Sequence, residues 1–124
     1  MKISIKATNL KLTDSIYAYI DKKIGELERF IGGVGGQSQL FEKGKPPYEA
    51  WVEVGKTMRH HRKGNVFRAE VQMRLPGKNL RAEAENLDLY AAIDEVKEEI
   101  EGELRKYKEK QVTIKKRGFK IYAQ

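Results

Sequence analysis

The chain has 124 residues, a formal net charge of +7 and no cysteine. This length fits a single domain whose one core lies between a sheet and one or two helices, so a multidomain enzyme is excluded. The lack of cysteine excludes disulfide bonds and any metal site or nucleophile that depends on a thiol.

The N-terminal segment predicts a strand followed by a helix. Residues 2–7 alternate polar and apolar side chains, and no apolar run of signal-peptide length lies near them. No stretch approaches the roughly 20 apolar residues of a membrane helix, so we expect a cytoplasmic protein. Thr13 fits the N-cap of the helix, and Gly32-Gly33 ends it. The apolar stripe of this helix consists of Ile16, Ile20, Ile24, Leu27 and Ile31.

Residues 32–47 contain five glycines and two prolines. This composition offers too little burial to offset the entropy of ordering, so we expect a mobile connection. A strand is predicted at residues 50–55, where apolar and polar positions alternate again. Trp51 falls on the polar side of this strand, where its ring could either stack on a nucleic-acid base or cap the sheet edge.

A hairpin is predicted from residues 66–75 and 80–85. Apolar side chains alternate with charged or polar ones in both runs, and Pro76-Gly77 supplies the turn. The preceding tip, residues 59–65, combines two adjacent histidines with three basic residues. Adjacent histidines on a strand project to opposite faces, which does not suit one shared metal ion. Phosphate contact by Arg59, Arg62 or Lys63 is the functional interpretation of this tip, and a solvated loop is the alternative.

A long helix is predicted to follow the hairpin. Asp88 fits its N-cap, and its acidic residues precede its basic ones, the order that complements the helix dipole. Its apolar stripe consists of Ile93, Val96, Ile100, Leu104 and Tyr107, which would cover the apolar face of the hairpin. Residues 112–124 are interpreted as a basic tail that is poorly ordered alone, although residues 112–114 could form a short strand.

The basic excess is concentrated in two places. Residues 105–124 hold eight basic residues and one acid, a net charge of +7, so residues 1–104 sum to zero. Between Glu53 and Glu70 there are five basic residues and no acid. Such clusters are typical of a protein that binds a polyanion, and a solubilising surface is the alternative.

Catalytic chemistry is not visible in the sequence. An enzyme needs a nucleophile with its base, a carboxylate pair in a cleft, or metal ligands at a workable spacing. The glutamates of the second helix occur with lysines at helical spacing, as on a solvated helix face. The glycines of residues 32–36 lack the lysine and the strand-to-helix context of a phosphate-binding loop. We therefore expect neither an enzyme nor a cofactor.

These elements predict an α+β fold. The order β-α-β-β-β-α gives a two-layer sandwich, in which a four-stranded sheet has two helices packed on one face. The architecture resembles the double-stranded-RNA-binding fold. Basic residues on two neighbouring helices and on the hairpin tip could follow folded RNA by its backbone and shape.

Four segments carry a family resemblance: residues 61–70 (HRKGNVFRAE), 75–78 (LPGK), 88–94 (DLYAAID) and 104–110 (LRKYKEK). In this order they resemble the ribosome hibernation-promoting factors, the family that includes ribosome-associated inhibitor A. The resemblance implies a stress protein that binds the small ribosomal subunit in the cleft used by transfer RNA and messenger RNA. Such a protein blocks translation by occupying the cleft, protects idle ribosomes, catalyses no reaction and is expected to be a monomer off the ribosome.

The resemblance also implies which residues contact phosphates. The basic residues of the second helix come first, then those of the first helix, the hairpin tip and the last strand. In that order they are Lys97, Arg105, Lys106 and Lys108; Lys22, Lys23 and Arg29; Arg59, Arg62 and Lys63; and Lys78 and Arg81. Tyr90 and Asp94 also match the family motif, but we expect Tyr90 to pack and Asp94 to serve local hydrogen bonding or helix-end electrostatics.

The chain departs from the family pattern in two ways. Residues 32–47 look longer and richer in glycine than the usual connection, and the chain stops at Gln124, where long members carry a further C-terminal domain that pairs two ribosomes. We therefore assign residues 1–111 to the ribosome-binding domain and residues 112–124 to a basic tail. Ribosome dimerisation by this chain alone is not expected.

Two other functions stay open. A general structured-RNA-binding module or RNA chaperone would bind any folded RNA with similar affinity. A protein-interaction module that regulates transcription would keep its partner after the basic clusters were neutralised.

Overall fold

The computed structural model describes the backbone of residues 1–31, 48–61 and 64–123, and the side chains of residues 1–31, 48–57 and 65–110. The elements are β1 (Lys2–Thr8), α1 (Asp14–Gly25), α2 (Glu28–Ile31), β2 (Glu49–His61), β3 (Gly64–Leu75), β4 (Lys78–Asn86) and α3 (Leu89–Ala123). This order confirms the predicted α+β sandwich, with the short α2 continuing the first helix.

The four strands form one sheet in the order β1-β2-β3-β4. β1 runs parallel to β2, and the other neighbours are antiparallel. The parallel pair is connected through the helices α1 and α2, whereas β3 and β4 need only the turn at Pro76-Gly77. Gly77 has a φ of 77°, which fits a type II turn with proline at its second position and glycine at its third.

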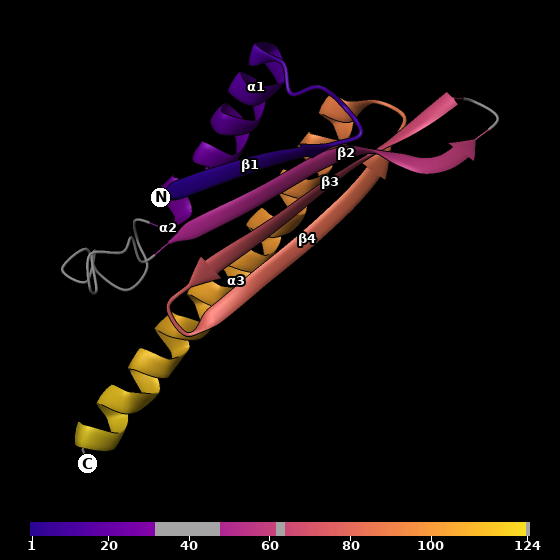
Figure 1. The fold of residues 1–124 in the computed structure, drawn as a ribbon. Helices are drawn as coiled ribbons and strands as arrows, with labels where there is room; N and C mark the ends of the chain where they lie inside the picture. Colours follow the sequence, from indigo (N-terminus) through magenta and orange to yellow (C-terminus); the bar gives the residue numbers. More distant parts are fainter. Residues whose placement is uncertain (32–47, 62–63, 124) are drawn as a thin grey trace.

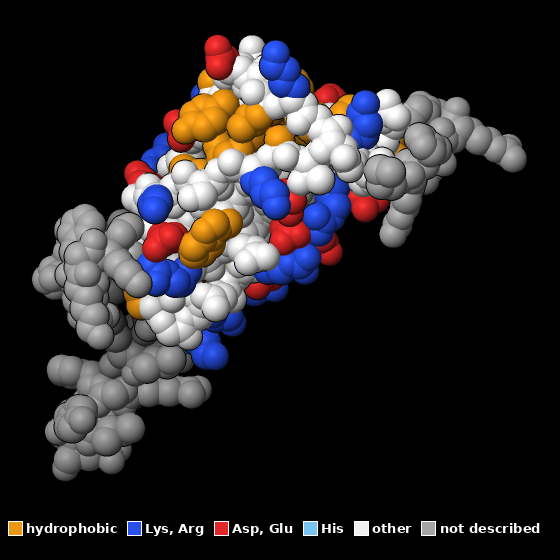
Figure 2. Space-filling model, in the orientation of Figure 1, with side chains coloured by type: hydrophobic (Ala, Val, Ile, Leu, Met, Phe, Trp, Pro, Cys, Tyr) orange, Lys and Arg blue, Asp and Glu red, His pale blue; other side chains and the backbone are white. Residues whose placement is uncertain are grey.

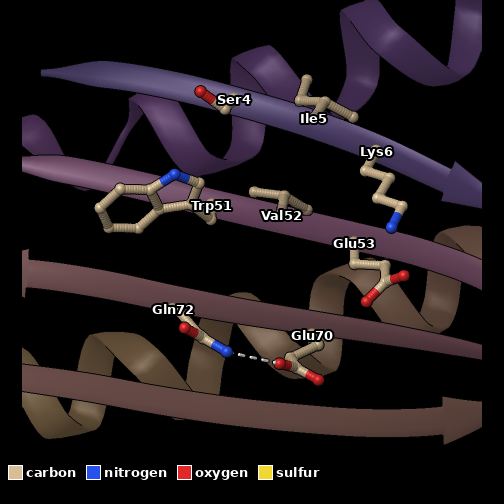
Figure 3. A pocket seen from close by; sticks show the side chains of 8 residues that line it. All are labelled: Ser4, Ile5, Lys6, Trp51, Val52, Glu53, Glu70 and Gln72. Atoms are coloured by element: carbon tan, nitrogen blue, oxygen red, sulfur yellow. Dashed lines mark hydrogen bonds between the residues drawn. The ribbon is translucent and has the colours of Figure 1, made fainter.

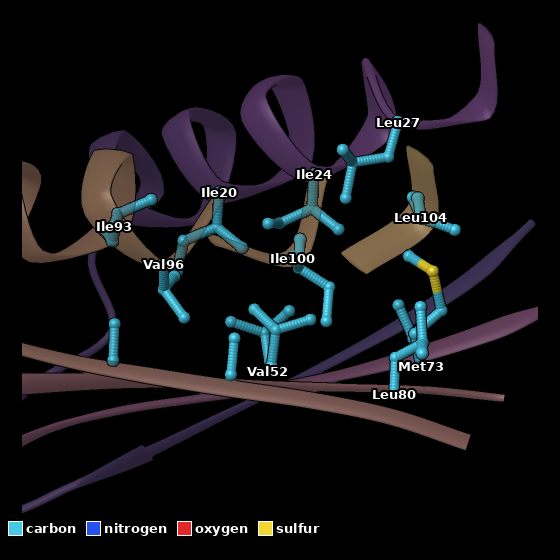
Figure 4. Packing of buried hydrophobic residues seen from close by; sticks show 14 of the residues in the cluster. Ile20, Ile24, Leu27, Val52, Met73, Leu80, Ile93, Val96, Ile100 and Leu104 are labelled. Atoms are coloured by element: carbon cyan, nitrogen blue, oxygen red, sulfur yellow. The ribbon is translucent and has the colours of Figure 1, made fainter. Parts of the chain in front are cut away.

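Both long helices pack on the same face of the sheet (Figures 1 and 4). The alternating apolar residues of the strands meet the apolar stripes of α1 and α3, and the predicted stripes are confirmed. The largest fully buried side chains are Ile20, Ile24, Leu27, Val54, Val71, Met73, Ile93, Val96 and Ile100. The opposite face of the sheet, here called the outer face, carries the polar positions of every strand.

Side chains cap both long helices as predicted. The Ile16 N–H donates to Thr13 Oγ1 at 3.2 Å, and the Tyr90 N–H donates to Asp88 Oδ1 at 3.0 Å. Each bond satisfies an amide that the first helical turn leaves without a partner. The polar side chains at these two positions therefore have a structural role.

The first helix is interrupted, contrary to the prediction of one helix up to Ile31. α1 ends at Gly25, and the Leu27 N–H then donates to the Ile24 carbonyl at 3.0 Å, which tightens the backbone before α2 begins. Glycine weakens a helix because it leaves the unfolded backbone more freedom. Leu27 and Ile31 still reach the core on either side of the break.

α3 is longer than predicted. It continues as one helix to Ala123, so the backbone of residues 112–114 is helical and does not form a short strand. The C-terminal part of α3 projects beyond the sheet (Figure 1). The predicted connection at residues 32–47 lies outside the described residues, as do Arg62 and Lys63 and the side chain of Arg59.

Candidate nucleic-acid interface

The seam between α1 and α3 begins with two tyrosines and an aspartate. The Tyr19 hydroxyl donates to Asp94 Oδ1 at 2.6 Å, and Lys23 Nζ lies 3.8 Å from the same oxygen. The rings of Tyr19 and Tyr90 meet edge to face, with 4.8 Å between their centroids. The hydrogen bond to Asp94, followed by burial, raises the pKa of Tyr19 to about 12. Tyr90 packs against Tyr19 as predicted, although it is 37% exposed. The hydrogen bond of Asp94 joins α3 to α1, so it is a contact between two elements and not the predicted local bond.

Further along the seam, Glu101 forms ion pairs with two of the residues that were predicted to contact phosphates. Lys97 Nζ lies 3.8 Å from one carboxylate oxygen of Glu101, and a guanidinium nitrogen of Arg105 lies 3.4 Å from the other. The Arg105 guanidinium also lies over the Phe30 ring, 5.7 Å from its centroid. The Lys97 side chain is mostly buried, whereas the Arg105 side chain is 64% exposed. Arg105 is therefore anchored and still open to a ligand.

Charge is distributed unevenly along α3. Residues 94–103 contain six acids and one lysine, and residues 105–110 contain four basic residues and one acid. The basic part lies beside α2, because Arg105 contacts Phe30. It also lies near the β3–β4 turn, because the Tyr107 hydroxyl donates to the Pro76 carbonyl at 2.7 Å. We call this region the basic end of the helical layer.

Five of the predicted residues gather at this basic end. Arg29 and Lys106 are 80% and 78% exposed, and within the described part of the chain each makes only a surface ion pair, with Glu26 at 3.5 Å and with Glu103 at 3.6 Å. Such exposed pairs contribute little, so a phosphate can replace them at low cost. The members of the group are Arg29, Lys78, Arg105, Lys106 and Lys108. Lys22 is exposed on α1, while Lys23 lies in the seam.

Arg81 belongs to a separate network on the outer face. It lies 3.2 Å from Glu70 and 3.3 Å from Glu83, and Arg68 bridges the same two carboxylates. Hydrogen bonds from Gln72, then Arg81 and Arg68, lower the pKa of Glu70 to about 2 despite its partial burial. The structure therefore does not bring Arg81 together with the helical residues. Figure 2 shows basic and acidic side chains intermixed along this side of the sheet.

Trp51 lies on the outer face, as the alternation predicted, and is 42% exposed. It stands between two depressions. One, of about 420 Å³, is lined by Ser4, Lys6, Trp51 and Gln72 among others (Figure 3). The other, of about 310 Å³, extends from Trp51 toward β4 and includes Arg74, Asn79 and Arg81.

Sequence reasoning missed the residues that orient the cations. The spacing of Lys97, Glu101 and Arg105 by four residues on one helix was the available signal for the Glu101 pairs. Nothing in the local sequence places Phe30 beside Arg105, because that contact joins two helices. The sequence pattern predicts only that Lys2 and Lys6 lie on a strand, whereas the structure shows that both are exposed on the outer face.

Across the part of the chain that the structure describes, no group of three or more histidines or carboxylates is arranged to hold a metal ion. Within the same residues, no helix combines the length and apolar character that crossing a membrane requires.

Known proteins resemble the chain in sequence. The family model described as Sigma 54 modulation protein / S30EA ribosomal protein matches residues 3–112. A ribosome hibernation promotion factor from Lactococcus lactis subsp. cremoris (strain MG1363) is 34% identical over 110 residues, or 87% of this chain and 50% of the relative. A ribosome hibernation promotion factor from Staphylococcus aureus (strain COL) is 37% identical over 108 residues, which cover 87% of this chain and 48% of the relative. The chain thus spans about half the length of the curated relatives it matches.

Solved structures share the fold. The N-terminal domain of Protein Y from Thermus thermophilus superposes with a TM-score of 0.65 at 31% identity, covering 86% of this chain and 99% of that one. A ribosomal subunit interface protein from Coxiella burnetii superposes with a TM-score of 0.62 at 17% identity, covering 87% of this chain and 98% of that one. At this identity the similarity shows the fold alone.

Proposed function

The chain belongs to the family described as Sigma 54 modulation protein / S30EA ribosomal protein, and from this membership we propose that it is a ribosome hibernation factor. The resemblance to hibernation-promoting factors is thereby confirmed. The match of the family model over residues 3–112, together with the similarity to relatives named for ribosome hibernation, carries the proposal. In this proposal the protein acts in the cytoplasm during stress and binds the small ribosomal subunit. It catalyses no reaction and uses no cofactor.

The basic end of the helical layer supports contact with ribosomal RNA. Arg29, Arg105 and Lys106 come from two neighbouring helices and expose most of their side chains. Lysine and arginine at such positions neutralise phosphates of a folded RNA without reading its sequence. The proposed contacts are Lys22, Arg29, Lys78, Arg105, Lys106 and Lys108, together with Arg59, Arg62 and Lys63 of the hairpin tip. Lys23 and Lys97 are secondary candidates because their side chains are mostly covered, and Arg81 is secondary because two carboxylates of the outer face hold it.

The proposed mechanism is occupancy. A rigid sandwich that presents cations from its helices fits the cleft of the small subunit, where it would exclude transfer RNA and messenger RNA. Residues 1–111 would supply this binding unit as a monomer, and the basic residues of 112–124 would add charge at the end of α3.

Co-sedimentation with separated ribosomal subunits tests the proposal. We expect stoichiometric binding to the small subunit at physiological salt, and displacement by transfer RNA. Arg29→Glu is expected to weaken this binding, because it reverses an exposed charge at the basic end. Equal and weak binding to both subunits and to unrelated folded RNA would contradict the proposal and leave a general RNA-binding module.

A further inference from the structure

Trp51 has an unusual position on the outer face. Its row of the sheet runs from Ser4 on β1 through Trp51 to Gln72 on β3 and Arg81 on β4. None of these neighbours is a bulky apolar residue that would cover the indole. A single exposed tryptophan needs no functional explanation by itself, but here it borders a depression on each side.

The two depressions have the size of small-ligand sites. Their volumes of about 420 Å³ and 310 Å³ lie within the range of about 300–1,000 Å³ that such sites occupy. Trp51 and Gln72 line both. The Gln72 amide nitrogen donates to Glu70 at 2.9 Å, so its carbonyl oxygen is the atom left to accept a hydrogen bond (Figure 3). A flat ring with amino groups at its edge could stack on the Trp51 indole and donate a hydrogen bond to the Gln72 carbonyl oxygen.

The charges around Trp51 favour a phosphate on the β1 side. Lys2 and Lys6 flank the Trp51 row, expose their side chains on the outer face and make no ion pair among the described residues. They are four residues apart on an extended strand, which separates them by about 13 Å. Of the acids beside these lysines, Glu49 is paired with Arg74, whereas Glu53 lies opposite Lys6 and lines the same depression. The charges of Glu70 and Glu83 are offset by Arg68 and Arg81. Lys2 and Lys6 therefore leave the edge along β1 with a small positive surplus over Glu53.

From these observations we propose that the outer face binds a short single-stranded RNA segment, with an unpaired base stacked on Trp51 and the phosphates running along Lys2 and Lys6. Aromatic side chains bind bases of any sequence by stacking, and cations beside them hold the backbone. The Gln72 carbonyl would accept from the amino group of an adenine, cytosine or guanine. The second depression leaves room for a neighbouring base beside Arg81.

This inference deepens the proposed function, because it gives the protein an RNA contact on each of its two faces. A protein that fills a cleft meets two walls, and the helical layer provides contacts for only one of them. The RNA contact at Trp51 can nevertheless be tested without ribosomes, so it can stand or fail separately from the hibernation proposal.

Trp51 is the only tryptophan of the chain, so its fluorescence reports on this site alone. The purified full chain is titrated with an oligomer of eight adenylates and with an RNA duplex of equal phosphate number. We expect the single strand to quench Trp51 and to protect it from acrylamide, with at least fivefold weaker effects from the duplex. An indole that stays accessible to acrylamide in the saturated complex, or equal effects from both RNAs, would overturn the proposal.

Variants separate this site from the basic end of the helical layer. Trp51→Ala should weaken binding of a labelled oligomer about tenfold, Trp51→Phe should retain most of the binding, and Lys6→Ala should weaken it severalfold. Lys106→Glu should leave the quenching by the oligomer unchanged while it reduces small-subunit binding. If the small subunit shields Trp51 but single-stranded RNA does not, the outer face meets a different surface of the subunit, and the assignment to single-stranded RNA is wrong.

Discussion

Glu70 is the residue on which the charges of the outer face converge. Arg68, Gln72 and Arg81 all donate to its carboxylate, and they lower its pKa from the usual 4.5 to about 2. Because the pKa is lower in the folded protein than in the unfolded chain, the ionised carboxylate stabilises the fold above about pH 4.5. This contribution is lost as the pH falls toward 2.

We predict that Glu70→Gln lowers the free energy of unfolding at pH 7 by about 1–2 kcal/mol, a value reduced for the partial exposure of the arginines. Urea unfolding at pH 7 and at pH 2.5 measures the effect, and the difference between variant and parent should shrink at the lower pH. Glu85→Gln on the same face is the control, because Glu85 is exposed. A constant difference at both pH values would contradict the assigned pKa.

Tyr19 joins the two helices through its hydroxyl. Its pKa of about 12 lies above the ordinary 10, so its hydrogen bond to Asp94 stabilises the fold up to about pH 10 and is lost between pH 10 and 12. Tyr19→Phe should therefore cost about 1 kcal/mol at pH 7. Chemical denaturation checks this value, with Tyr17→Phe as the control because Tyr17 is half exposed. Equal effects of the two substitutions would argue against the Asp94 bond.

Two glycines show how the same substitution acts differently in a helix and in a sheet. A Cβ at Gly102, in the middle of α3, would meet nothing within 4 Å, whereas at Gly55 it would come within 2.7 Å of the Thr8 carbonyl oxygen on β1. Gly102→Ala should stabilise the protein by about 1 kcal/mol, since alanine favours the helix. Gly55→Ala should destabilise it by roughly 1–3 kcal/mol, because β1 and β2 must move apart. Thermal unfolding of both variants measures the opposite signs, and a stable Gly55→Ala protein would contradict the close packing of these strands.

At the scale of elements, the sequence was informative wherever a pattern is local. Alternation predicted the faces of all four strands, and Thr13 and Asp88 were recognised as caps because a cap acts within one turn. The break after Gly25 was missed, since an apolar stripe can continue through Leu27 whether or not the helix is continuous.

Contacts between elements could not be predicted in the same way. Arg81 can form ion pairs with Glu70 and Glu83 because of the cross-strand register of β3 and β4. Arg105 lies over Phe30 because of the way in which α2 and α3 pack. Composition therefore identified the cations of the candidate site, but only the tertiary structure separates those on the basic end from those held on the outer face.

For the whole molecule, the arrangement of charge matters more than its total. Lys11 and Lys106 carry the same charge and are both exposed, but they lie at opposite ends of the helical layer. Lys11 borders a depression beside the start of α3, together with Asp88 and Tyr90. Lys106 lies at the basic end, where we propose that the local surplus of cations attracts phosphates.

We predict that Lys106→Glu weakens binding to the small ribosomal subunit at least tenfold, whereas Lys11→Glu has less than a threefold effect. If about five phosphates are contacted, the logarithm of affinity should fall with the logarithm of salt concentration with a slope of order −3 to −5. The slope should become shallower by about one for Lys106→Glu only. Filter binding of labelled subunits between low and physiological salt gives both quantities. Equal losses in the two variants would mean that net charge alone drives binding, since the two substitutions change the total charge identically and differ only in position.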